Sequence, residues 1–150
     1  MNQEQIEEYG LHQTLDCYKC SEQALDDDQL IYDFLNNFPA KIGMKKICEP
    51  NLVRVGATTE KDPGGVSGIV MISESHISIH TYPKRQFFTM DVYSCNRFDT
   101  ELVKTIVRKT FGVGIFEENV VVRGKYFKKL ATLVPSSKPT QKTKMIKARA

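Results

Sequence analysis

A short internal repeat limits the folds that this 150-residue chain can adopt. Residues 14–20 read Thr-Leu-Asp-Cys-Tyr-Lys-Cys and residues 89–95 read Thr-Met-Asp-Val-Tyr-Ser-Cys, so that Thr, Asp, Tyr and the last Cys coincide. Each copy is a strand-like run that precedes a helix with an acidic start and then another strand. This shared order of elements favours duplication over a chance match. Two repeated strand-helix-strand halves predict an α+β two-layer sandwich, an antiparallel sheet with helices on one face.

Helix signals occur at two places. Three aspartates at 26–28 suit a helix N-terminus, and apolar residues follow at helical spacing up to Ile42. We expect Pro39 to kink or end this helix near Asn37–Phe38. The second helix begins at Asp99-Thr100 and stops at Phe111, before two glycines. Strands are expected over residues 11–18, 46–55 with a break at Pro50, 68–73, 76–81, 87–95 and 120–123.

The charge of the chain is unevenly distributed. Residues 125–150 carry eight basic residues and no acidic one, whereas residues 1–124 carry 13 basic and 18 acidic residues. From Pro135 onward the composition is mostly Ser, Pro, Thr and Lys, which is typical of disorder. We therefore expect one domain, 1–124, and a basic, disordered tail, 125–150. The tail either keeps the protein in solution or contacts nucleic acid or another acidic surface.

The sequence gives no sign of secretion. No apolar run is long enough to cross a bilayer, and the acidic N-terminus is unlike a signal peptide. We expect a cytoplasmic location and hence free thiols at the four cysteines, which are Cys17, Cys20, Cys48 and Cys95. Cys17 and Cys20 lie three residues apart, and on a strand such residues face opposite sides, so no metal site is expected there.

Residues 73–83, the central motif, read Ser-Glu-Ser-His-Ile-Ser-Ile-His-Thr-Tyr-Pro. In a strand Ile77 and Ile79 point to one side, and His76, Ser78 and His80 point to the other. Such a polar face is costly to bury unless its groups are hydrogen-bonded, so the residues alone allow a core strand or a site. The motif lacks the Gly-x-Ser-x-Gly turn of a serine hydrolase, the helical His-Glu-x-x-His of a zinc enzyme and a phosphate-binding loop.

The stretch from Gly65-Val66-Ser67-Gly68, through the central motif, to Asp91-Val92-Tyr93-Ser94-Cys95 resembles the prokaryotic S-adenosylmethionine decarboxylase proenzymes. The resemblance extends over residues 10–125 and leaves out the basic tail. It implies a pyruvoyl-dependent carboxy-lyase that cleaves itself between Glu74 and Ser75 into a β chain, 1–74, and an α chain, 75–150. It also implies a small-molecule substrate and a homodimer of αβ units with the sites at the interface.

This resemblance gives Ser75 two successive roles. Its hydroxyl would attack the carbonyl of Glu74 and convert the amide into an ester, and β-elimination would leave dehydroalanine, which hydrolyses to a pyruvoyl group. The ketone of that cofactor would form a Schiff base with the α-amine of the substrate and accept electrons as CO₂ leaves.

Three further positions receive roles from the same resemblance. His80 would be the acid/base of self-cleavage, and Ser67 would hydrogen-bond the tetrahedral processing intermediate. Cys95 would return a proton to the substrate Cα after decarboxylation, although a small buried hydrophobic residue is its alternative reading. The flanking residues His76, Ser73 and Ser78 would have structural or supporting polar roles.

Two positions depart from the family pattern. Lys61 stands where an aromatic residue usually stacks on adenine, and Lys84 stands where a carboxylate usually accepts the ribose hydroxyls. The family favours S-adenosylmethionine, whose decarboxylated product donates aminopropyl groups for spermidine. The two lysines keep open a pyruvoyl-dependent arginine or ornithine decarboxylase as the alternative, and a non-catalytic regulatory paralogue as a third hypothesis.

Overall fold

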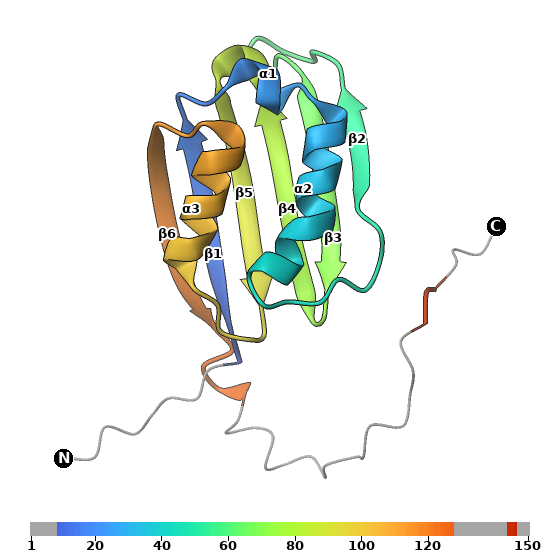
Figure 1. The fold of residues 1–150 in the computed structure, drawn as a ribbon, viewed down its shortest axis with the longest axis vertical. Helices are drawn as coiled ribbons and strands as arrows, with labels where there is room; N and C mark the ends of the chain where they lie inside the picture. The colour runs from blue at the N-terminus through green and yellow to red at the C-terminus, as the bar shows by residue number, and fades with distance from the viewer. Residues whose placement is uncertain (1–8, 128–143, 147–150) are drawn as a thin grey trace.

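The computed structural model describes residues 9–127 and 144–146. In chain order its elements are β1 (Gly10–Tyr18), α1 (Glu22–Leu25), α2 (Asp28–Lys41), β2 (Asn51–Val55), β3 (Gly65–Ile72), β4 (Ser75–Tyr82), the 3-10 helix η1 (Pro83–Arg85), β5 (Phe87–Ser94), α3 (Thr100–Phe111) and β6 (Ile115–Arg123). The six strands form one sheet in the order β2-β3-β4-β5-β1-β6, and every neighbouring pair is antiparallel. Figure 1 shows α2 and α3 across the same face of this sheet. The predicted α+β fold, an antiparallel sheet with helices on one face, is confirmed.

Aspartate caps begin both long helices. The carboxylate of Asp27 accepts a backbone hydrogen bond from the first turn of α2 at 3.0 Å, and that of Asp99 accepts two from α3 at 2.9 and 3.0 Å. These N–H groups have no partner within the helix, so each cap contributes about 1 kcal/mol. Gly112, at φ 67°, ends α3 as the sequence predicted.

Pro39 was predicted to kink or end α2 near Asn37–Phe38; it does not end the helix, which continues to Lys41, and the kink stays a prediction. Pro39 lies in the last turn, where its missing N–H removes one helical hydrogen bond. Phe38 and Ile42 are buried on either side of it. Burial of two such side chains contributes about 1.5–3 kcal/mol each, which offsets the cost of the proline.

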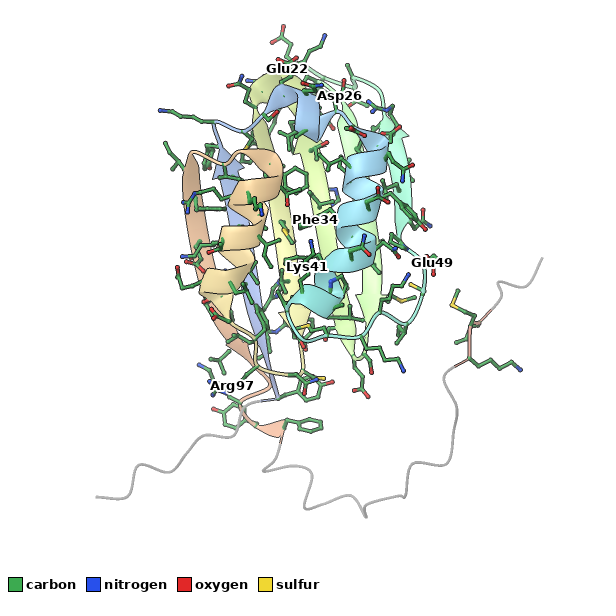
Figure 2. All side chains as sticks on the ribbon, viewed as in Figure 1. Glu22, Asp26, Phe34, Lys41, Glu49 and Arg97 are labelled. Atoms are coloured by element: carbon green, nitrogen blue, oxygen red, sulfur yellow. The ribbon has the colours of Figure 1, made fainter. Side chains whose placement is uncertain are left out.

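The core lies between the sheet and the two long helices. Phe34 points from α2 toward α3, and its ring centroid lies 4.7 Å from that of Phe38 and 5.0 Å from that of Phe111 (Figure 2). The sheet contributes alternate strand residues to this core, including Leu15, Val70, Ile77, Ile79, Phe88, Met90 and Val92. The alternation expected for the central motif, with both isoleucines turned inward, is therefore confirmed.

We call the opposite side of the sheet the open face. Strand pairing sets its side chains in rows, because antiparallel partners lie side by side. The first row comprises Val121, His12, Tyr93, His76 and Met71; the second comprises Asn119, Thr14, Asp91, Ser78 and Ile69; the third comprises Glu117, Asp16, Thr89, His80 and Ser67. The open face thus carries all three histidines of the chain together with several apolar side chains.

Some element boundaries differ from those predicted. Residues 46–50 make only an isolated bridge, at Lys46, so β2 begins after Pro50, and β6 begins five residues earlier than expected, at Ile115. The helix α1, a single turn capped by Ser21, was not predicted from the sequence.

The two copies of the repeat pair directly with each other, Thr14 with Asp91 and Asp16 with Thr89. Equivalence of the complete halves stays a prediction.

Within the part of the chain that the structure describes, no helix combines the length and the apolar character needed to cross a bilayer. The predicted disorder of the basic tail falls mostly on residues 128–143 and 147–150, which lie outside the described residues.

Candidate active site

The predicted cleavage site lies at the tip of the hairpin that joins β3 and β4. Ile72 and Ser75 are the last paired residues, so only Ser73 and Glu74 form the turn. The backbone N–H of Ser73 donates to the carbonyl of Lys45 at 2.9 Å, which ties the turn to the neighbouring segment. The Ser75 hydroxyl donates to the carbonyl oxygen of Glu74. The hydroxyl therefore lies beside the carbonyl group that it would attack.

Cys95 lies at the same end of the sheet as Ser75. His76 pairs with Tyr93, so the residue before His76 and the residues after Tyr93 share one edge. Tyr9 lies at this end of the sheet too, one residue before β1, and both Cys95 and Glu74 are close enough to influence its phenol. Burial, followed by the negative charges of Cys95 and Glu74, raises the pKa of the Tyr9 phenol above its usual value. Glu74 and Ser75, the residues of the predicted cleavage, thus lie at the same end of the sheet as the predicted proton donor, Cys95.

Ser67 and His80 form a second group, on the open face. They are direct partners across β3 and β4, and Ser67 Oγ lies 2.9 Å from His80 Nδ1. Both line a pocket of about 410 Å³, to which Asn51, Ile69 and Ser78 also contribute. Sequence reasoning placed these two residues in one site, and the structure brings them into contact.

One chain does not bring the two groups together. His80 follows Ser75 by five residues in β4, which corresponds to about 16 Å along an extended strand. The alternation of β4 also turns Ser75 toward the helix side of the sheet and His80 toward the open face. The predicted action of His80 on Ser75 is therefore not explained by the geometry of a single chain.

Sequence reasoning missed a polar cluster on the open face. His12 Nε2 lies 2.8 Å from Asp91 Oδ1, and His12 Nδ1 lies 3.0 Å from the guanidinium of Arg123. Arg123 also lies over the ring of Tyr93, 4.6 Å from its centroid. Alternation in residues 11–18 could have placed His12 on the polar side of its strand. Its partners could not have been found, because they depend on which strands pair.

Lys61 and Lys84, the two departures from the family pattern, are both exposed. Their loops lie side by side, since the Arg85 guanidinium donates to the carbonyl of Glu60 at 2.5 Å. Lys84 lines a pocket of about 290 Å³ together with Glu22, Asp26 and Arg54, at the end of the molecule where α1 lies (Figure 2). Carboxylates therefore border this pocket, although Asp26 pairs with Arg54 at 2.6 Å.

Of the remaining cysteines, Cys17 and Cys20 are buried in the core, and Cys48 is partly exposed in the loop before β2. All four thiols are unpaired. Burial raises the pKa of Cys17 well above its usual value and raises that of Cys20 to about 11, so neither thiol is a reactive thiolate at neutral pH. Among the described residues no group of three or more His, Cys, Asp or Glu side chains could hold a metal ion.

Comparison with known proteins gives a consistent result. The family model for S-adenosylmethionine decarboxylase matches residues 11–124. An S-adenosylmethionine decarboxylase proenzyme of Methanococcus maripaludis is 37% identical over 95 residues, covering 63% of this chain and 72% of that protein. One of Caldicellulosiruptor saccharolyticus is 32% identical over 124 residues, covering 75% and 94%. The crystal structure of the adenosylmethionine decarboxylase from Aquifex aeolicus has the same fold, with a TM-score of 0.65 at 23% identity over 89% of this chain and 98% of that one.

Proposed function

This chain belongs to the S-adenosylmethionine decarboxylase family, and from that membership we propose that it works as a self-processing, pyruvoyl-dependent enzyme. Its activity is that of an adenosylmethionine decarboxylase proenzyme, a carboxy-lyase, on the evidence of the family match and of relatives at 32–38% identity. The observation that carries the processing route is the Ser75 hydroxyl, which contacts the Glu74 carbonyl at a hairpin tip.

Self-cleavage uses only atoms of the chain and one water. Ser75 Oγ bonds to the carbonyl carbon of Glu74, and the C–N bond breaks, so the amide becomes an ester. Removal of the Ser75 Cα proton then breaks the Cβ–Oγ bond, and Glu74 leaves as the carboxylate end of the β chain, 1–74. The resulting dehydroalanine takes up water and releases ammonia, which leaves a pyruvoyl group at the start of the α chain, 75–150.

The pyruvoyl group supplies a ketone that accepts electrons when CO₂ leaves the substrate. The surroundings of Ser75 fit such a group. The backbone hydrogen bond from Ser73 to Lys45 fixes the hairpin tip, and Cys95 lies at the same end of the sheet. Cys95 donates a proton to the substrate Cα after CO₂ has left. A thiol suits this role since its proton exchanges near neutral pH.

We further propose a homodimer that forms through the open face. Five apolar side chains on this face are 43–58% exposed, namely Val53, Ile69, Met71, Ile115 and Val121. Burying these side chains in an interface gains hydrophobic free energy. In a dimer with a two-fold axis, each copy contributes the same patch of surface. If the two sheets cross so that opposite ends meet, the Ser67–His80 pair of one copy comes to lie near the hairpin tip that carries Ser75 in the other. This arrangement removes the separation of about 16 Å found within one chain.

The shared site predicts complementation between two inactive chains. A His80→Ala chain alone should remain uncut because it lacks the acid/base of elimination. Co-expressed with a Ser75→Ala chain, it receives His80 from its partner in mixed dimers, and about half of the His80→Ala chains should be cut if pairing is random. Intact-mass analysis of differently tagged chains measures this. A His80→Ala chain that stays uncut in the mixture would contradict the shared site.

Carbon dioxide release from S-adenosylmethionine, arginine and ornithine tests the substrate. The family favours S-adenosylmethionine, and exposed lysines at 61 and 84 keep the two amino acids as competitors. Activity on S-adenosylmethionine is the expected result. Activity confined to arginine or ornithine would favour the alternative, and a chain that never cleaves itself would favour the non-catalytic paralogue.

Lys84→Glu tests whether this position contacts the substrate. A carboxylate there can accept hydrogen bonds from the ribose hydroxyls, and a charged hydrogen bond is worth about 1.5–3 kcal/mol. We expect the KM for S-adenosylmethionine to fall about tenfold with kcat unchanged. Lys41→Glu, the same charge change at the exposed end of α2, is the matched control. An equal effect of the two substitutions would place Lys84 outside the site.

A further inference from the structure

The polar cluster of the open face forms a chain of hydrogen bonds across four strands. Arg123 of β6 contacts His12 of β1 at 3.0 Å, and His12 contacts Asp91 of β5 at 2.8 Å. The second carboxylate oxygen of Asp91 accepts from the hydroxyl of Ser78, in β4, at 3.4 Å. The last member, Ser78, lines the pocket that contains Ser67 and His80.

The chemistry of the donors fixes the direction of every bond in this chain. A guanidinium can only donate, so His12 Nδ1 accepts from Arg123 and the proton of the neutral ring lies on Nε2. That N–H donates to Asp91, which as a carboxylate can only accept. The remaining oxygen of Asp91 therefore accepts the hydrogen bond that the Ser78 hydroxyl donates. Toward the pocket, the Ser78 hydroxyl can therefore only accept hydrogen bonds, through its lone pairs.

Two features hold the carboxylate in this orientation. Arg123 is fixed by the ring of Tyr93, 4.6 Å beneath it, as well as by His12. The side chains of His12 and Asp91 are 19% and 35% exposed, so water competes only partly for their hydrogen bond. Charge-assisted hydrogen bonds of this kind are stronger than neutral ones.

We propose that Asp91 is a positioning residue of this enzyme, which holds the Ser78 hydroxyl with its lone pairs toward the pocket of Ser67 and His80. The proposal rests on the proposed function and deepens it, because it states what this pocket selects. A hydroxyl that can only accept, backed by a carboxylate, favours a substrate group that is cationic or carries N–H or O–H donors. A sulfonium nucleoside and a basic amino acid both meet this description.

Asp91→Asn tests the proposal with almost no change of shape. The amide oxygen can still accept from His12, but the amide nitrogen then donates to Ser78, which turns the Ser78 proton toward the pocket. We expect the KM to rise about tenfold, kcat to stay within about twofold, and self-cleavage to remain complete. Asp16→Asn is the matched control, since Asp16 lies on the same face one strand away and makes no contact with Ser78.

Ser78→Ala provides the second arm and should raise the KM by a similar factor. Because Asp91 acts through Ser78, the double variant should be no worse than Ser78→Ala alone. An unchanged KM in Ser78→Ala, or losses that multiply in the double variant, would overturn the proposal. If the wild-type chain cleaves but releases no CO₂ from any of the three substrates, the proposed function and this inference fail together. An active wild type with a silent Asp91→Asn refutes the inference alone.

Discussion

Ser75→Ala should leave the chain whole, as one species of 17.1 kDa, where the wild type yields two chains of nearly equal size. Alanine has no hydroxyl to bond to the Glu74 carbonyl, and an unactivated peptide bond does not break on a laboratory timescale. Because the pyruvoyl group arises from residue 75 itself, decarboxylation should be lost together with cleavage. The expected effect is thus complete for both reactions, and intact-mass analysis and CO₂ release measure them.

Ser73→Ala is the matched control for this experiment. It removes a hydroxyl from the same two-residue turn, while the backbone hydrogen bond from residue 73 to Lys45 is kept. We expect it to cleave fully. A Ser75→Ala chain that is still cut between residues 74 and 75 would show that another nucleophile acts, and the route through an ester would be wrong.

Cys95→Ala should separate the two reactions. The variant keeps Ser75 and its turn, so self-cleavage should proceed and the α chain should carry the pyruvoyl mass. Decarboxylation loses the group that protonates Cα, and removal of a general acid costs about 10²–10⁴ in kcat. The KM should change little because the thiol acts after binding. Single-turnover CO₂ release and intact mass on the same sample provide both readouts.

Cys48→Ala is the control here, since Cys48 is also an unpaired and partly exposed thiol but lies in the loop before β2. It should leave kcat unchanged. If Cys95→Ala retains full kcat, Cys95 is the small packed hydrophobic residue that the sequence also allowed, and another group protonates the product.

The sequence was sufficient to predict those features of the fold that depend on a single strand or a single helix. Alternation in β4 predicted that Ile77 and Ile79 face the core while His80 does not, and the aspartates predicted both helix starts. These features follow from local geometry with a period of 2 or 3.6 residues. The contact between Ser67 and His80 could also be predicted, because a short hairpin sets the register of its two strands.

The sequence was insufficient to predict contacts between strands that are far apart along the chain. Residues of β1 lie beside those of β5 and β6, at separations of about 80 and 110 residues, and no local pattern encodes that choice. The contacts of His12 with Asp91 and Arg123 were missed for this reason. The distance between Ser75 and His80 could not be read from the sequence for another reason: a family motif records which residues cooperate, but not whether one chain provides all of them.

The order of strands in the sheet has a consequence for the protein after it is cut. β1, β2 and β3 would belong to the β chain, and β4, β5 and β6 to the α chain. In the sheet, β1 lies between β5 and β6, while β3 lies beside β4. The two fragments would therefore be joined along three pairs of strands by backbone hydrogen bonds, and neither could leave without disrupting the sheet. Maturation would convert one polypeptide into an inseparable heterodimer, so folding has to be complete before the bond at residue 74 is broken.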